Sequence, residues 1–539
     1  MVCEEIKEER GGLWLEGGGG GGGRQVEVVV VVVVSLAVNK REGSAVTAGV
    51  CRLREASAAW LDTLVTYSDP MEGVRQRKIG GDPLLHKKAA PPGGTMSSFR
   101  LIRFLFYGIT VCLAFLLILV TLNNTWPIKS AGHTTNSLDH VSVALGVQER
   151  THAVVLDAGS TGSRVLAFTF FKSRSDNSLK LDDELWHEVK PGLSSFADDP
   201  VKGAESLLPL LKLAKERIPE QYWSSTPLVL KATAGLRLLP DEKAEALLLE
   251  VKKVLSNSGF HTTENSVGIM DGRDEGIFSW FTVNYLLDRI TGTPKDTLVA
   301  LDLGGGSTQI TFVPMEDDTV RGTPADYLTT ISLLHKNLNL YTHSYLGLGL
   351  MAARKAILVQ HRGEDGIIHS PCVNPIVDHE WTYGGETYII RGPVVPKYQE
   401  VRGQAGRLSE NRPVADYKEC VKACMTIIKE QVHAPKELKT REVIAFSYFF
   451  DRATERGLID PFKGGVLTMQ ELLNAATQTC SIPNVEQPLA CLDLTFITTL
   501  LTSGYGLQGT NTLKLYKRID NHEVSWALGL AYHVINNGI

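Results

Sequence analysis

Two stretches of the chain share a pattern in which apolar residues lead into an aspartate, glycines and small hydroxyl residues. The first runs from Val154 to Arg164 and the second from Val299 to Gln309. Each is followed by another β-rich run, so each pattern predicts a β-hairpin rather than a strand that enters a helix. A repeat of this kind favours two similar lobes, each presenting its hairpin to a shared cleft.

Residues 1–95 show no sustained helix or strand periodicity. They contain runs of seven glycines (17–23) and seven valines (28–34). The apolar run at 28–38 is too short to cross a bilayer as a helix, which takes roughly 20 residues. We expect residues 1–95 to be disordered or not normally translated, with Met96 as the working start.

A second change of pattern follows Met96. Arg100 and Arg103 precede an uncharged apolar stretch, Phe104 to Leu122. This predicts an N-terminal signal-anchor transmembrane segment within 96–122, with its basic flank in the cytoplasm and the following chain in the lumen. A cleaved signal peptide is the alternative, which the length of the stretch disfavours.

The rest of the chain then divides into a luminal stem at 123–150 and a folded unit at 151–539. This organisation predicts a type II membrane protein of the Golgi or endoplasmic reticulum, or a secreted form. Whether the stem is cut stays open.

Composition narrows the function classes. The 539 residues carry 55 basic and 60 acidic side chains, a net charge of −5, which disfavours a broadly basic nucleic-acid binder. Eight cysteines are too few for a small disulfide-stapled scaffold. The cysteines in the luminal part are odd in number, so one should stay free. Cys420 and Cys424 are too close for a comfortable bridge and lack the spacing of a zinc site.

The two hairpin tips have the chemistry of a phosphate site. Glycines let the backbone approach an anion, successive N–H groups form a concave nest, and hydroxyl groups add donors. A single glycine-rich turn of this kind is as often structural, but two in one chain indicate binding. The expected phosphate-binding residues at the tips are Gly159, Ser160, Thr161, Gly162, Gly304, Gly305 and Gly306.

Asp157 and Asp302 lie beside these tips. Their carboxylates would repel phosphate unless a hydrated divalent cation lies between them. A Mg²⁺ ion held mostly through waters fits that need. The sequence thus predicts a metal site at Asp157 and Asp302.

At this point the chain resembles the ectonucleoside triphosphate diphosphohydrolases, or apyrases, and most closely their single-anchor or secreted nucleoside diphosphatase members. The resemblance covers Val154 to His533. The matching motifs, in chain order, are Asp157–Arg164, Lys231–Arg237, Met270–Gly276, Asp302–Gln309 and Ala445–Asp451, with further likeness at Ser344–Gly349 and Ser525–Gly529.

The resemblance implies an α/β, two-lobed actin-like (ribonuclease H-like) ATPase fold, with the lobes exchanging chain near the C-terminal end. It implies hydrolysis of a terminal phosphate anhydride with Mg²⁺ or Ca²⁺. Glu275 would be the base that activates water, helped by Ser307 and Gln309, and Thr233 would contact phosphate or metal-bound water. From the residues alone, Glu275 could equally be an acid at a helix N-terminus.

The resemblance also implies two disulfides, Cys372 with Cys420 and Cys480 with Cys491, which leave Cys424 unpaired. Phe449 and Phe450 stand where related enzymes typically carry tyrosines. These two side chains could stack on a nucleobase, although aromatic residues at such positions are more often core.

Other charged and aromatic residues keep two interpretations. Arg164, Arg237 and Lys231 could bind phosphate, but salt bridges are the commoner use of such residues. We interpret Asp271 and Asp274 as acids of a turn or of the first helical turn. Trp526 is expected to be a core anchor in a packed C-terminal helix.

The predicted reaction is hydrolysis of a nucleoside diphosphate, with UDP and GDP preferred by family similarity, to the monophosphate and phosphate. In the lumen this would clear the diphosphate left by glycosyltransferases. The nearest alternative is a broad apyrase that also takes triphosphates. A kinase or chaperone-like ATPase of the same fold, and a catalytically dead binding protein, are weaker alternatives. The expected partners are the nucleotide substrate and a membrane, which the N-terminal helix would enter. No nucleic-acid partner is expected, and the oligomeric state stays open.

Overall fold

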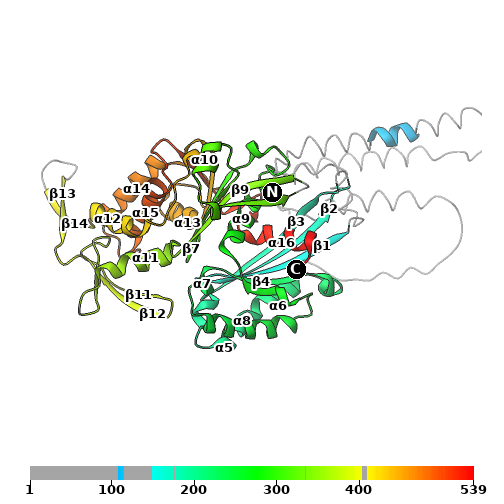
Figure 1. The fold of residues 1–539 in the computed structure, drawn as a ribbon, viewed down its shortest axis with the longest axis horizontal. Coiled ribbons are helices and arrows are strands. Elements are labelled where there is room, and N and C mark those ends of the chain that lie inside the picture. Colours follow the sequence, from blue (N-terminus) through cyan, green and yellow to red (C-terminus); the bar gives the residue numbers. More distant parts are fainter. Residues whose placement is uncertain (1–106, 115–148, 175–176, 334–335, 403–408) are drawn as a thin grey trace, which may run out of the picture. The chain divides into compact units, whose positions relative to one another are not determined.

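The structure, a computed structural model, describes residues 107–114, 149–174, 177–333, 336–402 and 409–539 (Figure 1). The chain divides after Phe115, and both lobes belong to the unit Leu116–Ile539. The predicted segment 1–95 lies outside the described residues, and so does the predicted stem 123–150 apart from its last two residues. Of the expected anchor only 107–114 is described, as a helix. Within the described ranges, no helix combines the length and apolar character that a membrane crossing requires.

The first lobe is built on a five-stranded sheet of order β3-β2-β1-β4-β5. Its strands are β1 (Arg150–Ala158), β2 (Ser163–Lys172), β3 (Leu179–Val189), β4 (Leu228–Ala232) and β5 (Val267–Ile269). β1 and β2 pair antiparallel, as the pattern at Val154–Arg164 predicted, and β4 pairs parallel with β1. The lobe's helices are α5 (Pro200–Glu205), α6 (Leu208–Arg217), α7 (Ala234–Arg237) and α8 (Asp241–Ser256).

The second lobe repeats this arrangement on a sheet of order β16-β17-β15-β6-β7-β9-β8. Its strands are β6 (Val299–Leu303), β7 (Ser307–Phe312), β8 (Leu328–Leu333), β9 (Lys336–Leu346), β15 (Val443–Ser447), β16 (Gly465–Thr468) and β17 (Thr512–Leu515). β6 and β7 form the second predicted hairpin, and β15 pairs parallel with β6 as β4 does with β1. The lobe's helices are α10 (Asp317–Gly322), α11 (Leu350–Leu358), α12 (Tyr417–Ile428), α13 (Tyr448–Glu455), α14 (Met469–Ser481) and α15 (Ala490–Thr499).

The two-residue period of the central strands divides the interior into layers. On β1, Val154 and Leu156 pack toward α6 and α8, while Val155 faces the opposite core. On β6, Leu301 packs toward α12 and α15, while Ala300 faces the same core as Val155. A shared layer therefore lies between the inner faces of the two sheets.

Two helices fill this shared layer, α9 (Gly272–Leu286) and α16 (Trp526–Asn537) (Figure 1). α9 follows the first sheet in sequence but packs on β6, β7 and β9 of the second. α16 follows the second sheet but packs on β1 and β2 of the first. The lobes therefore exchange helices, as expected for the actin-like fold, and the backbone N–H of Gly529 on α16 donates to Thr282 Oγ1 on α9 at 3.0 Å.

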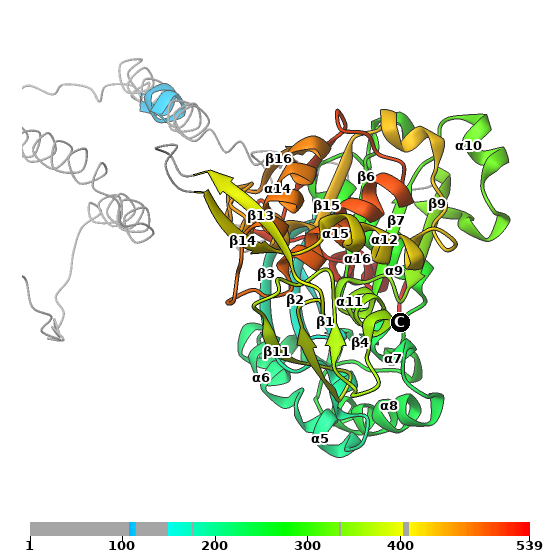
Figure 2. The same ribbon diagram turned by 90° about the vertical axis from the view of Figure 1, so that its left-hand side faces the viewer.

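The second lobe also carries smaller β elements. β10 (Ile368–His369), β11 (Asp378–Tyr383) and β12 (Glu386–Arg391) form a three-stranded sheet, and β13 (Lys397–Arg402) pairs with β14 (Ser409–Val414) in a separate ribbon (Figure 2). The short strands β18 (Arg518–Ile519) and β19 (His522–Glu523) pair with each other just before α16.

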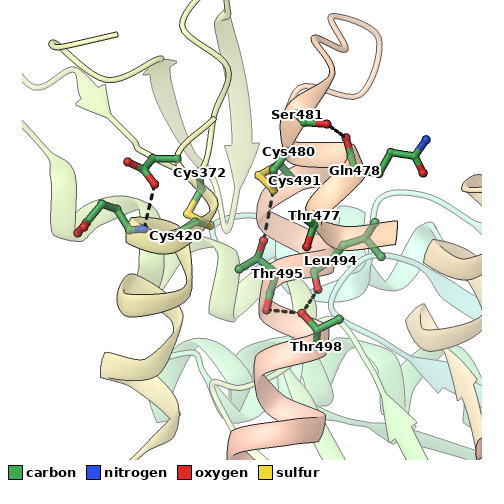
Figure 3. Close-up of a disulfide and its surroundings, with 12 residues drawn as sticks. Cys372, Cys420, Thr477, Gln478, Cys480, Ser481, Cys491, Leu494, Thr495 and Thr498 are labelled. Atoms are coloured by element: carbon green, nitrogen blue, oxygen red, sulfur yellow. Dashed lines mark hydrogen bonds between the residues drawn. A yellow bond between two sulfur atoms is a disulfide. The ribbon is translucent and has the colours of Figure 1, made fainter. Parts of the chain in front are cut away.

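Both expected disulfides are present, and both lie in the second lobe (Figure 3). Cys372 is bonded to Cys420 of α12, and Cys480 of α14 is bonded to Cys491 of α15. Cys424 is buried and free, one turn after Cys420 on the same helix. The bonds tie the helices that cover the outer face of the second sheet.

Candidate active site

The strand alternation that divides the core also places the two motif aspartates. Asp157 ends β1 on the face shared by Ala153 and Val155, and Asp302 lies on the face of Ala300. Both carboxylates therefore point to the layer that α9 and α16 occupy. The repeated motif therefore places one aspartate in each lobe, on the face of the sheet that is turned toward the other lobe.

The hairpin tips have the same closed form. Gly159 N donates to Gly162 O at 3.0 Å, and Gly304 N donates to Ser307 O at 3.0 Å. The tips lie against each other, because a Cβ added to Gly305 would collide with Ser160 Oγ and lie 3.1 Å from Thr161 Cγ2. Only glycine allows this approach of the two lobes.

A cavity of about 450 Å³ opens between the lobes at these tips. Its walls bring together most of the residues that the sequence singled out. These are Asp157, Gly159, Ser160, Thr161, Thr233, Glu275, Asp302, Gly304, Gly305, Gly306, Ser307 and Phe450. The predicted shared cleft is therefore present.

Three predicted residues do not line the cavity. Gly162 packs against the side chain of Glu188, and Gln309 lies behind Ser307 in the sheet. Phe449 is 3% exposed within the core of the second lobe. Phe450 lines the cavity but is also only 3% exposed, so little of its ring is open to a base.

Asp157 and Asp302 are both buried yet have different partners. Arg164 Nη1 lies 3.0 Å from Asp157 Oδ2, and Arg164 Nη2 lies 2.7 Å from Glu188 Oε1. Asp302 Oδ2 instead accepts a hydrogen bond from Ser279 Oγ at 3.4 Å. Burial raises the pKa of Asp157 above its ordinary value, and it raises the pKa of Asp302 to about 6.

These two acids fit a divalent cation. Asp157 Oδ1 and Asp302 Oδ1 are buried and have no hydrogen-bond partner, which is costly unless a ligand completes them. No group of three or more acidic, histidine or cysteine side chains suited to a metal occurs among the described residues. A cation here would therefore draw most of its ligands from water and substrate, as Mg²⁺ commonly does.

Glu275 lies in the first turn of α9, where its backbone N–H donates to Asp271 O at 3.0 Å. Its side chain is 6% exposed and forms an ion pair with Arg237 Nη2. Burial raises the pKa of Glu275 to about 8, since the Arg237 charge offsets only part of the desolvation and the charges of Asp302 and Asp157 add to it. A carboxyl group of this pKa can hold or release a proton near neutral pH.

Ser307 and Gln309 belong to a hydrogen-bonded group beside Glu275. Gln309 Nε2 donates to Ser307 Oγ at 2.8 Å and to Ser344 Oγ at 2.9 Å. Gln309 Oε1 is buried and has no partner. Glu275 and Ser307 line the cavity, and the unpartnered Gln309 Oε1 lies buried behind Ser307, where a water molecule would complete it.

The ambiguous charged residues are now placed. Asp271 caps α9 by accepting from Arg273 N at 2.8 Å, as a turn acid does. Lys231 Nζ donates to Asn265 O at 2.8 Å and does not line the cavity. Arg164 lines the cavity in an ion pair with Asp157, and Arg237 is at the site through its ion pair with Glu275. Trp526 is 4% exposed and belongs to the core, as expected, although it also lines the cavity.

Sequence reasoning missed two serines of the site. Ser447 is the last residue of β15 and directly precedes α13, as Thr233 directly precedes α7. It lines the cavity and has a positive φ of 56°. Ser344 lies directly opposite Gln309 in the pairing of β9 with β7. Both belong to stretches that carry family likeness, but only strand pairing shows what they touch.

Comparison with known proteins places the chain among nucleotide phosphatases. The model of the GDA1/CD39 (nucleoside phosphatase) family matches residues 144–538. Ectonucleoside triphosphate diphosphohydrolase 5 from Bos taurus is 40% identical over 413 residues, 75% of this chain and 91% of that protein. Nucleoside diphosphate phosphatase ENTPD5 from Homo sapiens is 40% identical over 394 residues, 72% of this chain and 88% of that protein.

One solved structure with a similar course of the chain is that of nucleoside triphosphate hydrolases from Neospora caninum. It aligns with 74% of this chain and 97% of that chain, at 14% identity and a TM-score of 0.48.

Proposed function

Because the chain belongs to the GDA1/CD39 (nucleoside phosphatase) family, we propose that it hydrolyses the terminal phosphate of nucleoside diphosphates to give a monophosphate and phosphate. UDP and GDP are the preferred substrates in this proposal. The observation that carries it is the meeting of two glycine-rich hairpins at a cavity that also exposes Glu275. Such an arrangement offers backbone donors to a phosphate from two sides and a base beside it.

The residues of the second hairpin and α9 would handle the attacking water. The unprotonated carboxylate of Glu275 accepts a proton from this water, and its pKa of about 8 suits such a transfer near neutral pH. Gln309 Oε1 and Ser307 Oγ hold the water in line with the phosphorus atom. No covalent intermediate is needed, since positioning and charge stabilisation supply most of the rate in phosphoryl transfer.

The glycine-rich tips and Thr233 would bind the phosphate oxygens. Backbone N–H groups at the tips act as donors fixed in place before the reaction, so little reorganisation accompanies the growing negative charge. Asp157 and Asp302 would hold Mg²⁺ or Ca²⁺, chiefly through waters. When bound, the cation offsets the charge of the diphosphate and polarises its terminal phosphate.

A phosphate-release screen over UDP, GDP, ADP, CDP and the triphosphates tests the proposal, with Mg²⁺, Ca²⁺ and EDTA arms. We expect release from diphosphates that EDTA abolishes. Comparable release from triphosphates would favour the broad apyrase. Phosphate transfer to an acceptor other than water would favour a kinase, and no release from any nucleotide would refute the proposal.

We further propose that the enzyme acts in the lumen of the Golgi or endoplasmic reticulum, as a type II membrane protein anchored by 96–122, or in a secreted form. The two disulfides of the second lobe support an oxidising compartment. Protease protection of the two-lobed unit in sealed microsomes would be expected, and digestion without detergent would contradict the topology. Sequencing the natural N-terminus would test Met96 as the start.

A further inference from the structure

The side-chain amide of Gln309 has both of its donor hydrogens engaged. Nε2 donates to Ser307 Oγ at 2.8 Å on the same strand and to Ser344 Oγ at 2.9 Å across the sheet. An amide nitrogen carries two donor hydrogens, so these bonds account for both. The amide oxygen is consequently turned away from the two serines and is left without a partner.

Ser344 is the member that links this amide to the acid. Its strand β9 pairs antiparallel with β7 and sets Ser344 directly opposite Gln309. Besides accepting from Gln309, Ser344 Oγ accepts from Arg237 Nη1 at 3.5 Å, and Arg237 Nη2 pairs with Glu275. A chain of contacts thus runs from Ser307 to Glu275 through one hydroxyl group.

The space around this hydroxyl group is tight. A Cβ added to Gly272, the first residue of α9, would lie 2.6 Å from both Ser344 Oγ and Arg237 Nη1. The N-terminus of α9 therefore closes directly over the contact between Ser344 and Arg237. A side chain larger than that of glycine at this position would collide with both groups.

We propose that Ser344 is a positioning residue that fixes the amide of Gln309 with its oxygen toward the attacking water. This inference rests on the proposed function and adds a residue to it. Without the Ser344 acceptor, one amide hydrogen of Gln309 has no hydrogen-bond partner. Rotation of the amide group, which exchanges its oxygen and nitrogen, then becomes favourable. A turned amide would present a donor where the water needs an acceptor.

The main test compares kcat and KM of Ser344→Ala with those of the parent chain, using UDP or GDP with Mg²⁺. We expect kcat to fall by roughly 10- to 100-fold, the scale of a lost transition-state contact, while KM changes by less than about 3-fold. A fall in stability alone would not produce this split when both enzymes are assayed well below their Tm.

Thr342→Val is the matched control. Thr342 lies two residues earlier on β9, and its hydroxyl bonds Thr311 of β7 at 2.7 Å, outside the group around Gln309. The variant also removes a buried cross-strand hydrogen bond but should keep the kcat of the parent. Equal losses of kcat in both variants would reduce Ser344 to a structural residue and overturn the proposal.

A double-mutant cycle with Gln309→Ala separates positioning from an independent effect. If Ser344 acts through Gln309, the double variant should have the kcat of Gln309→Ala within about 2-fold. Losses that multiply would overturn the proposal. Should Ser344→Ala fail to fold, Ser344→Cys keeps the side-chain size with a weak acceptor and should show the same fall in kcat; full kcat in that variant would also overturn it.

The activity of the parent chain distinguishes failure of the proposed function from failure of the proposal for Ser344. If the parent releases no phosphate from any nucleoside diphosphate, the function itself is refuted before a variant is compared. If the parent is active and Gln309→Ala retains full kcat, the water-orienting role of Gln309 and the positioning role of Ser344 both fail.

Discussion

The two hairpins of the cleft are alike in backbone and unlike in side-chain partners. Each tip closes with a glycine N–H to the carbonyl three residues on, and each aspartate faces the shared layer. Yet Asp157 is paired with Arg164, which also binds Glu188, whereas the partners of Asp302 are the hydroxyl groups of Ser279 and Ser447. The two hairpins therefore share their backbone form but differ in the side chains around them.

This difference indicates a division of labour within the cleft. The first hairpin carries charge compensation, because its arginine neutralises part of the acid's charge. The second carries hydroxyl and amide groups next to Glu275, which suit the handling of water. Variants that act on one hairpin at a time therefore test whether the two sides of the cleft differ in this way.

The largest effect is expected at Glu275, the proposed general base. Glu275→Gln should lower kcat by about 10² to 10⁴, the range for loss of a general base, because the amide cannot take the proton of the water. Nucleotide binding should stay close to that of the parent, since the glycine-rich tips are untouched. Phosphate release and equilibrium binding of a nonhydrolysable diphosphate analogue measure the two effects.

A parent-like kcat in Glu275→Gln would leave Glu275 as a helix N-terminal acid and remove it from the mechanism. Weakened binding together with unchanged single-turnover chemistry would place it with the phosphate cradle instead.

The next largest effect separates the two aspartates. Asp157→Asn and Asp302→Asn should each lower kcat by roughly 10- to 100-fold and raise the Mg²⁺ concentration needed for activity. They should differ in stability, because Asp157→Asn strips Arg164 of one acid at a cost of about 1–3 kcal/mol. Asp302→Asn removes a buried charge with no ion pair and should be near neutral without cation. Metal titration measures the Mg²⁺ requirement, and denaturant unfolding in EDTA measures the stability. Equal stability losses in the two variants would contradict the proposed difference between Asp157 and Asp302.

A moderate effect is expected where the tips meet. Gly305→Ala would force the second tip away from Ser160 and should lower kcat/KM by about 10-fold, since small misplacements are costly in catalysis. Gly322→Ala is the control, because a Cβ there meets nothing within 4 Å. Steady-state kinetics of the two variants suffice. If both behave like the parent, the tips do not need their close approach.

Much of the cleft is predictable from sequence because its residues sit at strand ends. The alternation along β1 and β6 fixes the face of Asp157 and Asp302, and glycines after each strand mark the turns. Such local periodicity is enough to expect two hairpins and a phosphate site, and the family likeness supplied Glu275.

The remainder depends on contacts between distant segments. Ser344 reaches Gln309 only through the register of β9 on β7, and Arg237 reaches Glu275 across two elements that are separated in sequence. Phe449 and Phe450 are adjacent, yet only Phe450 lines the cavity. No periodicity in one segment encodes these relations, because the partner lies on another.

The smallest predicted effect concerns the pH dependence of stability and tests whether the shared layer disfavours charge at Glu275. A pKa of about 8 in the folded state lies above the ordinary 4.5 of the unfolded chain. The folded state therefore binds the proton more tightly, and the stability this provides is present below pH 4.5 and lost as pH rises toward 8. The glutamine of Glu275→Gln cannot titrate. The difference in Tm, variant minus parent, should therefore increase by about 2 °C or more from pH 5 to pH 9. Calorimetry in EDTA without nucleotide measures this difference, and Thr342→Val, whose lost hydroxyl bonds only Thr311, should follow the parent. A constant difference in Tm between Glu275→Gln and the parent would mean that the charge of Arg237 fully offsets the charge of Glu275. The acid beside the second hairpin would then be as well neutralised as Asp157 is by Arg164.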